Sequence, residues 1–321
     1  GIDITQQTPR LGELSRGCPV RGAFCYESRG NAGVREFPWE TIERELERFA
    51  AEGVRRIFVL DATFNYNRSR AKDILKRIIA SAPEIEFIME IRAEILDAEL
   101  VELFAQVNCS LQIGIQSIHA EVLKKINRSM DPERFVANIA MLNDAGIVYG
   151  FDLIYGLPGD SLAGFYESFD FAMDLLPNHI DIFPLAVLPG TELSDRAAEY
   201  GLNYCAEAPY TMVSHPGITP DEMREAREFD AFYNEGKAVS WFPLLAEYLD
   251  LSPAGFLLTL LPLAADLPPH GFDPLSWQLA LLALLLPGAE QQPAREVLAD
   301  ILRLFQGEEP ERFDPEDLLE H

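Results

Sequence analysis

Residues 16–28 read RGCPVRGAFCYES, and the interpretation of the whole chain depends on this stretch. The Gly-Cys-Pro sequence at 17–19 favours a sharp exit from a strand, and Cys25 follows seven residues after Cys18. Gly22 lies between the two cysteines. Thiolates are the soft ligands that iron takes in iron–sulfur clusters, whereas free cysteines usually behave as small buried hydrophobes. The stretch is therefore either a metal-binding loop or a turn with two buried cysteines.

The composition predicts a soluble protein with a sizeable core. The chain has 321 residues, 48% of them apolar, which is enough for one large domain with a smaller one appended. Its net charge of −26 repels phosphate groups, so neither nucleic acid nor an anionic membrane surface is expected as a partner. Four cysteines without a paired framework fit a reducing, cytoplasmic location. The longest apolar run, 279–286, is far shorter than the roughly 20 residues that a membrane span needs.

Short apolar strands alternate with amphipathic helical stretches along most of the chain, which is typical of a parallel sheet with helices outside it. The expected strands lie near Leu14 and at 56–60, 85–91, 111–115, 148–155 and 180–185, and the expected helices at 38–53, 71–80, 94–107, 131–145 and 162–176. This makes six β/α units. Further helices are expected at 219–233, 277–286 and 296–305, so that a barrel at 1–200, a connecting segment at 201–241 and a Leu-rich helical region at 242–321 follow one another.

Polar residues gather where the expected strands end. Asp61 and Asn65 follow the second strand, and Glu90 and Arg92 end the third. Gln116 and Ser117 follow the fourth strand, and Asp152 lies late in the fifth. In parallel barrels the loops after the strands carry the chemistry, so these side chains are expected to converge on one rim with the cysteine loop. Taken singly, such an Asp or Gln is more often a helix cap or a turn residue.

The order of motifs resembles the radical S-adenosylmethionine (SAM) superfamily, in the branch whose members often carry an N-terminal cobalamin-binding domain. The resemblance covers about 11–210 and is carried by RGCP, FVLDATFN, FIMEIRAE, LQIGIQS, VLKKINR, DLIYGLPGD and LAVLPGTEL. It implies a partial (β/α)6 TIM-like barrel with a mainly helical C-terminal extension. In that family three cysteines spaced C-x3-C-x2-C hold a [4Fe-4S] cluster. Cys18 and Cys25 match the first and third of these ligands, and Gly22 stands at the second.

The resemblance also implies roles for individual residues toward SAM. Phe24 would face the adenine, and the loop with Asp61, Thr63 and Asn65 would hold the methionyl amine. Arginine suits a carboxylate, and carboxylates or amides suit ribose hydroxyls and amines. By similarity, Glu90 and Gln116 would contact the amine or the ribose of SAM. Arg128 would contact its carboxylate, and Asp152 would contact the ribose side.

Two functions follow from these observations. The first is an enzyme that reductively cleaves SAM at a [4Fe-4S] cluster and acts on an unknown small-molecule substrate, with flavodoxin or ferredoxin as electron donor. Cobalamin-dependent methyl transfer is one form of this function, if a cobalamin domain precedes the chain. The alternative is a non-catalytic barrel that binds SAM or a nucleoside and lacks a functional cluster, because Gly22 has no side chain to replace the second cysteine. Of the remaining thiols, Cys109 is expected at the end of its strand opposite the rim, and Cys205, in the segment after the barrel, could in principle reach back to the loop.

Overall fold

The computed structural model describes residues 9–28, 33–236, 246 and 250–264. The described part of the chain forms two compact units. One comprises residues up to 168 together with 177–220, and the other comprises 169–176 together with the described residues from 221 onward. The division into segments at 200 and 241 therefore stays a prediction.

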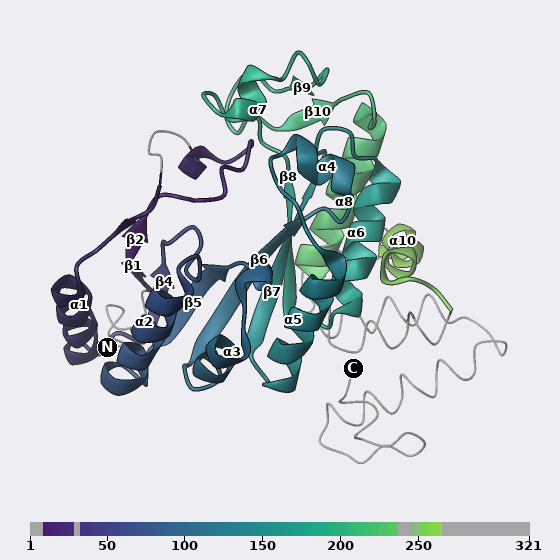
Figure 1. Ribbon diagram of the computed structural model, residues 1–321. Coiled ribbons are helices and arrows are strands. Elements are labelled where there is room, and N and C mark those ends of the chain that lie inside the picture. Colours follow the sequence, from purple (N-terminus) through teal and green to yellow (C-terminus); the bar gives the residue numbers. More distant parts are fainter. Residues whose placement is uncertain (1–8, 29–32, 237–245, 247–249, 265–321) are drawn as a thin grey trace, which may run out of the picture. The chain divides into compact units, whose positions relative to one another are not determined.

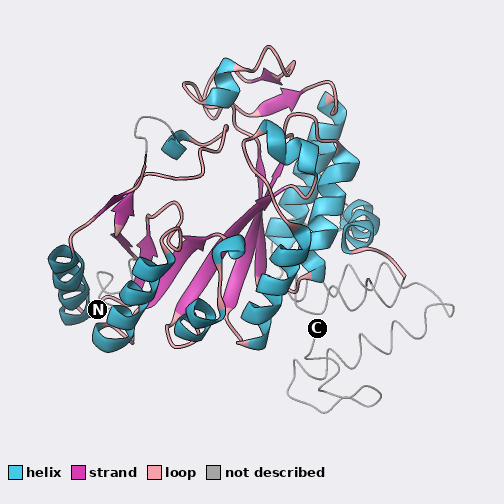
Figure 2. Ribbon diagram, in the orientation of Figure 1, coloured by secondary structure: helices cyan, strands magenta, loops and turns pink. Residues whose placement is uncertain are grey.

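The first unit contains a sheet of six parallel strands that lie side by side in the order of the sequence (Figures 1 and 2). The strands are β1 (Arg10–Gly12), β4 (Arg56–Val59), β5 (Glu86–Ile91), β6 (Cys109–Gln116), β7 (Val148–Tyr155) and β8 (His179–Pro184). The predicted succession of six β/α units is confirmed. The first strand begins earlier than expected, since Leu14 lies two residues beyond β1 and donates its backbone N–H to Asp61 Oδ1 at 2.7 Å.

The strands alternate in character with the period of two that a pleated strand imposes. In β5 the side chains of Phe87, Met89 and Ile91 are buried, and β6 and β7 continue the pattern with residues such as Leu111 and Phe151. The alternate positions on the other face include Glu90, Gln112 and Asp152. The sheet therefore offers one apolar face and one face that carries polar groups.

Side-chain caps decide where the helices begin. The helices that follow the strands of the first unit are α1 (Trp39–Ala51), α2 (Arg68–Ser81), α3 (Ala98–Phe104), α5 (Pro132–Asp144) and α6 (Leu162–Asp174). Asn67 accepts a hydrogen bond from the backbone N–H of Arg70, which starts α2 three residues before the predicted position. Asp97 accepts from the N–H of Leu100 and starts α3 there, so the predicted helix 94–107 is a short 3-10 turn at Ala93–Ile95 followed by α3.

Several short elements lie at the rim of the sheet and have no periodic signal in the sequence. The cysteine loop lies between β2 (Ser15–Arg16) and β3 (Arg35–Glu36), which pair with each other in antiparallel fashion. The others are α4 (Ala120–Lys125), α7 (Glu192–Asp195) and the antiparallel pair β9 (Asn203–Tyr204) and β10 (Met212–Ser214). Elements of two to six residues are too short for periodicity to reveal.

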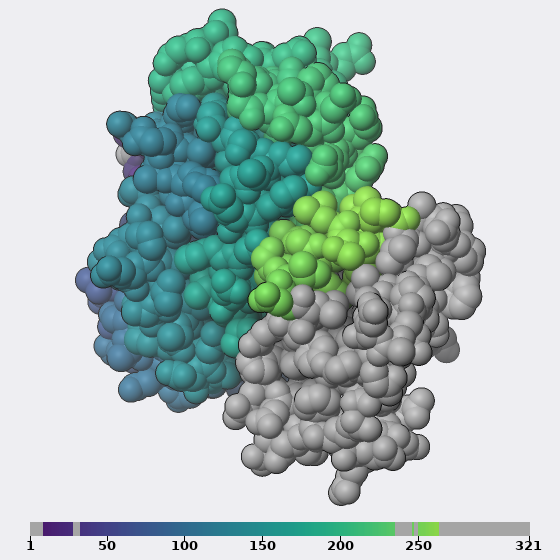
Figure 3. Space-filling model, turned by 90° about the vertical axis from the view of Figure 1, so that its right-hand side faces the viewer, coloured from purple at the N-terminus to yellow at the C-terminus, as the bar shows by residue number. Residues whose placement is uncertain are grey.

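The second unit is helical in its described part. It holds the end of α6, α8 (Pro220–Gly236) and α10 (Pro253–Ala264), the last of which is the yellow-green segment in Figure 3. The Phe169 ring lies edge-on to Phe229, with 5.0 Å between ring centroids, and Asp170 accepts the backbone N–H of Ala254 at 2.6 Å. The predicted helix 219–233 is confirmed, and the predicted helices 277–286 and 296–305 lie outside the described residues. No helix in the described part of the chain is both long and apolar enough to cross a membrane.

Candidate functional site

A cavity of about 860 Å³ opens in the first unit, along the carboxyl halves of the strands. Its walls come from the cysteine loop, from the strands β4 to β8 or the residues just after them, and from the segment after α4. Eight of the ten predicted site residues line it: Cys18, Phe24, Cys25, Thr63, Glu90, Gln116, Arg128 and Asp152. Of the strand-end residues expected to converge on one rim with the cysteine loop, Glu90, Gln116 and Asp152 line the cavity, whereas the lining does not include Asp61, Asn65, Arg92 and Ser117.

Backbone hydrogen bonds tie the cysteine loop to the segment that carries Arg128. The N–H of Ala23 donates to the carbonyl of Ile126 at 3.0 Å, and the carbonyl of Ala23 accepts the N–H of Leu193 at 2.9 Å. The side chain of Asn127 donates to the carbonyl of Arg21 at 3.4 Å. These hydrogen bonds hold the cysteine loop against residues 126 and 127, which directly precede Arg128.

Gly22 has room for a side chain. A Cβ built at this residue would meet its nearest atoms, Cys25 Cβ and the Phe24 ring, at 3.7 Å, which is ordinary van der Waals contact. Its φ also lies outside the left-handed region that favours glycine. Gly17 differs in both respects, with a φ of +104° and only 2.6 Å between a built Cβ and the carbonyl oxygen of Gly33. The backbone at Gly22 therefore permits a cysteine, although the sequence has none there.

The other two cysteines do not supply a third thiolate. Cys109 is the first residue of β6 and so lies at the end of the sheet away from the cavity, where burial raises the pKa of its thiol to about 12. Cys205 is exposed and lies outside the cavity lining. The described residues hold no group of three or more His, Cys, Asp or Glu side chains placed to bind a metal. Two thiolates, Cys18 and Cys25, do not fit a [4Fe-4S] cluster that three loop cysteines hold.

Asp61 and Asn65 hold the backbone rather than face the cavity. Asp61 accepts the Leu14 N–H on Oδ1 and the Ser15 hydroxyl on Oδ2, at 2.7 and 2.5 Å, and burial raises the pKa of its carboxyl. Asn65 is fully buried and pairs with Arg92 in both directions, donating to its carbonyl at 2.9 Å and accepting its N–H at 3.0 Å. Of the three predicted residues in this loop, the structure brings only Thr63 into the cavity.

Two carboxyl groups face the cavity from neighbouring parts of the sheet. Burial raises the pKa of Glu90, at the end of β5, and the nearby Asp152 raises it further. Burial also raises the pKa of Asp152. The hydrogen bond that Gln112 donates to the Asp152 carboxylate lowers this pKa, and repulsion from Asp181 raises it. Because these carboxylates repel one another when ionised, a cationic group of a ligand would be stabilised beside them.

Arg128 and Gln116 lie over the glycine of β6. A Cβ at Gly114 would come within 2.3 Å of Gln116 Nε2 and 3.0 Å of Arg128 Nη1, so glycine makes room for both side chains. Gln116 is 7% exposed, has a φ of +68°, and its Oε1 has no hydrogen-bond partner among the described residues. Burial lowers the pKa of Arg128, and within the described part of the chain its guanidinium makes one hydrogen bond, a long contact of 3.4 Å from Nη1 to the Gly114 carbonyl. Gln116 Oε1 could therefore accept a hydrogen bond from a ligand, and the Arg128 guanidinium could donate hydrogen bonds to one. The positive φ of Gln116 is a backbone strain of the kind that is common at functional sites.

Gln112, Asp181 and His179 were not predicted from the sequence. Gln112 and Asp181 line the cavity, and His179 is hydrogen-bonded to Gln112. Gln112 lies inside the LQIGIQS motif, from which only Gln116 was assigned a role, and His179 and Asp181 lie in none of the quoted motifs. The signal that could have found Gln112 and Asp181 is the period of two, since they lie on the same face of the sheet as Glu90 and Asp152, with which they pair.

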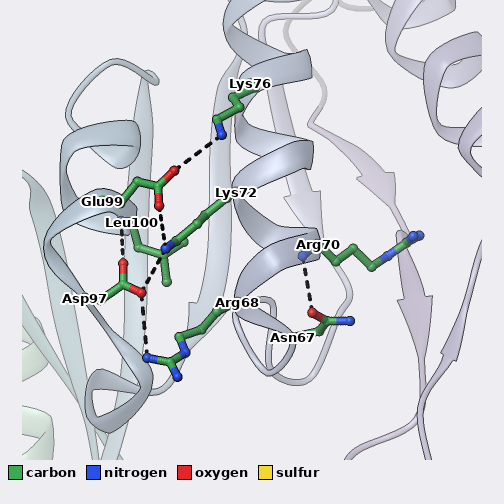
Figure 4. A network of polar contacts seen from close by, with 8 residues as sticks. All are labelled: Asn67, Arg68, Arg70, Lys72, Lys76, Asp97, Glu99 and Leu100. Atoms are coloured by element: carbon green, nitrogen blue, oxygen red, sulfur yellow. Dashed lines mark hydrogen bonds and ion pairs between the residues drawn. The ribbon is translucent and has the colours of Figure 1, made fainter.

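A second polar depression, of about 820 Å³, is lined by residues of α2 and by Asp97 and Glu99. Its cations already have carboxylate partners, as Figure 4 shows. Lys72 lies 2.9 Å from Asp97 and 2.8 Å from Glu99, and Lys76 and Arg68 contact the same two carboxylates at 3.4 and 3.7 Å. This network joins two helices and is satisfied by its own ion pairs.

Comparisons with known proteins agree with the motif order. The sequence model of the radical SAM superfamily matches residues 13–172. The cobalamin-dependent radical SAM methyltransferase TokK of Streptomyces tokunonensis is 25% identical over 232 residues, 68% of this chain and 33% of that protein. The 2-(S-pantetheinyl)-carbapenam-3-carboxylate methyltransferase of Streptantibioticus cattleyicolor is 28% identical, over 67% of this chain and 33% of that protein. The chain thus spans about a third of the length of these relatives.

Solved structures show the same fold. The radical SAM methyltransferase TsrM from Kitasatospora setae, solved with cobalamin and a [4Fe-4S] cluster bound, has a TM-score of 0.57 at 18% identity, over 66% of this chain and 44% of that one. The cobalamin-dependent SAM radical enzyme OxsB has a TM-score of 0.55 at 14% identity, over 96% of this chain and 52% of that one.

Proposed function

The chain belongs to the radical SAM superfamily, and from that premise we propose that its cavity binds SAM. The observation that carries this proposal is that the cavity lining holds charges of both signs. Arg128 lines the cavity together with the carboxyls of Glu90 and Asp152, and it is close enough to lower the pKa of each of them against the effect of burial. SAM presents a carboxylate, an ammonium group and a sulfonium, so its charges complement this arrangement.

Each group of SAM has a chemically suitable partner in the lining. Arg128 would take the carboxylate, because a guanidinium can donate two parallel hydrogen bonds to it. Gln116 Oε1, which has no partner among the described residues, would accept from the ammonium group together with Glu90. Asp152 suits the ribose hydroxyls, and the Phe24 ring suits the face of the adenine. A carboxylate bound to Arg128 would offset the cost of burying its guanidinium, and Gln116 Oε1 would gain a hydrogen-bond partner.

The radical enzyme is the second candidate, and one observation favours it. Cys18 and Cys25 line the same cavity as the proposed SAM residues, with Phe24 directly before Cys25. A [4Fe-4S] cluster, when bound, supplies the electron that cleaves SAM. Because the loop offers two thiolates, we derive no cleavage step for this chain. That function needs a third ligand, an electron donor such as flavodoxin or ferredoxin, and a small-molecule substrate. Cobalamin would be needed for methyl transfer of the kind that the names of the relatives describe.

Calorimetric titration of SAM tests the proposed binding. The parent protein should bind one SAM per chain, and Arg128→Ala should bind it roughly 10- to 150-fold more weakly, because a hydrogen bond to a charged group contributes about 1.5–3 kcal/mol. Arg134→Ala is the matched control, since Arg134 is an exposed arginine of α5 outside the cavity lining. Equal affinity of the parent and Arg128→Ala, or no binding by the parent, would overturn the proposal.

A further inference from the structure

A hydrogen-bonded network lies beside the proposed SAM residues, on the same face of β6, β7 and β8. The pairing register sets Gln112 opposite Gly150, and Gly150 opposite His179, in one row across the three strands. In the next row toward the carboxyl ends, Asp152 is opposite Asp181. The four polar side chains therefore come from adjacent rows of one rigid sheet, as the precise placement of ligand groups requires.

Both polar atoms of the Gln112 side-chain amide form hydrogen bonds. Its Oε1 accepts from Nε2 of His179 at 2.9 Å, which places the proton on that ring nitrogen. Its Nε2 donates to Asp152 Oδ1 at 2.5 Å and to Asp181 Oδ2 at 3.0 Å. The amide thus fixes the positions of both carboxylates, and the imidazole fixes the amide. A carboxylate has further lone pairs that one such bond leaves open.

Glycine makes room for this network. A Cβ at Gly150 would lie 2.1 Å from His179 Nε2 and 2.4 Å from two other ring atoms, so no larger residue fits beneath the imidazole where it stands. Glycine inside a strand weakens it and often marks a close approach of another group. Gly150 therefore weakens its strand locally, and it makes the space that lets the His179 imidazole contact Gln112.

The charges of this region are not balanced within the chain. In the described part of the protein no lysine or arginine forms an ion pair with Glu90, Asp152 or Asp181, and the one cation near Asp181 would be a protonated His179 at 3.9 Å. Arg16, the other arginine in the lining, is bonded to Glu13. Glu27 adds a fourth carboxylate to the lining. When these carboxyls are ionised, Arg128 and the single net positive charge of SAM together do not balance them, so the lining stays negatively charged when SAM is bound.

The shape of the site also indicates that the region receives a ligand. Gln112, Asp152 and Asp181 line the cavity of about 860 Å³. Large apolar side chains of the lining are exposed as well. Phe183, two residues after Asp181 in β8, is 48% exposed, and Phe58 and Leu60, in and just after β4, are 38% and 53% exposed. Exposed apolar side chains mark binding surfaces, and Phe183 would pack against an apolar body.

We propose that this region is a substrate subsite for a protonated amine attached to an apolar body, with Asp181 as the residue that contacts the ammonium group. Gln112 is a positioning residue that holds Asp181 and Asp152 in place. The inference rests on the proposed function, because SAM occupies the adjoining part of the cavity. Asp181 is the contact because its side chain is 48% exposed and Gln112 engages one of its two oxygens.

The test uses 2-phenylethylamine, which is protonated at neutral pH, and its neutral analogue 2-phenylethanol as probes. Both are titrated into the protein saturated with SAM. The amine should bind at least about tenfold more tightly than the alcohol, since an ammonium–carboxylate hydrogen bond is charge-assisted. Asp181→Asn should remove this preference and leave SAM affinity within about twofold, because the contact of Asp181 is with substrate. Asp144→Asn, which changes an exposed carboxylate of α5, is the matched control.

The variant Gln112→Leu examines the positioning role. It should reduce the preference for the amine although both carboxylates remain, whereas a merely structural residue would change thermal stability and leave the preference intact. Equal binding of amine and alcohol by the parent, or an undiminished preference in Asp181→Asn, would overturn the inference while SAM still binds. Failure of SAM to bind at all would instead remove the proposed function on which the inference rests.

Discussion

Restoring a cysteine at Gly22 should convert the loop into one that holds an iron–sulfur cluster. The structure gives the size of the perturbation: a Cβ at Gly22 meets its nearest neighbours at 3.7 Å, and the backbone there needs no left-handed φ. The substitution should therefore cost no stability. It should even add about 0.4–1 kcal/mol, because replacing glycine reduces the entropy of the unfolded chain. The loop would then offer three thiolates spaced C-x3-C-x2-C instead of two.

Iron and sulfide analysis after anaerobic reconstitution measures the outcome. Gly22→Cys should rise toward about four irons per chain, the content of one [4Fe-4S] cluster, and the parent should stay well below this value. Ser81→Cys is the control, because it adds a thiol at an exposed position at the end of α2. An unchanged iron content in Gly22→Cys would refute the reasoning, and four irons in the parent would show that another ligand completes the site.

Three further predictions concern the groups around the cavity. Burial raises the pKa of Asp152, so the protein loses stability as pH rises through the raised pKa and the buried carboxyl ionises. The Asn side chain of Asp152→Asn does not ionise, so the Tm of this variant minus that of the parent should be higher at pH 7 than at pH 4.5. An equal Tm difference at the two pH values would contradict this prediction. Asn65→Ala leaves the buried N–H and carbonyl of Arg92 without their partner, so thermal or urea unfolding should show a loss of about 2–4 kcal/mol, and a loss below about 0.5 kcal/mol would contradict the backbone role. In the native protein a maleimide should label the exposed Cys205 rapidly and the buried Cys109 only on unfolding, and rapid labelling of Cys109 would contradict its burial.

The sequence predicts the sheet well because the strands are short apolar runs bounded by turn residues. The predicted strand 148–155 coincides with β7, and the apolar core of β6 is found as well. Helix starts are predicted less accurately, because a single side-chain hydrogen bond decides them. Asn67 and Asp97 each accept a backbone N–H three residues ahead, and the helices begin where these caps stand.

The candidate site shows a different limit. The positions of Asp61 and Asn65 at the end of a strand are apparent from the sequence, but the directions of their side chains are not. Their partners are the backbone of Leu14, 47 residues away, and that of Arg92, 27 residues away. Such partners exist only once the strands have come together. Glu90 and Asp152 point into the cavity because the alternation of their strands places them on the inner face, which a period of two does predict.

A crystal structure of the protein soaked with SAM tests the central claim most directly. The account predicts SAM in the cavity, with its carboxylate within hydrogen-bond distance of the Arg128 guanidinium and its adenine beside the Phe24 ring. Density for SAM elsewhere on the protein, or an empty cavity at saturating SAM, would contradict the account.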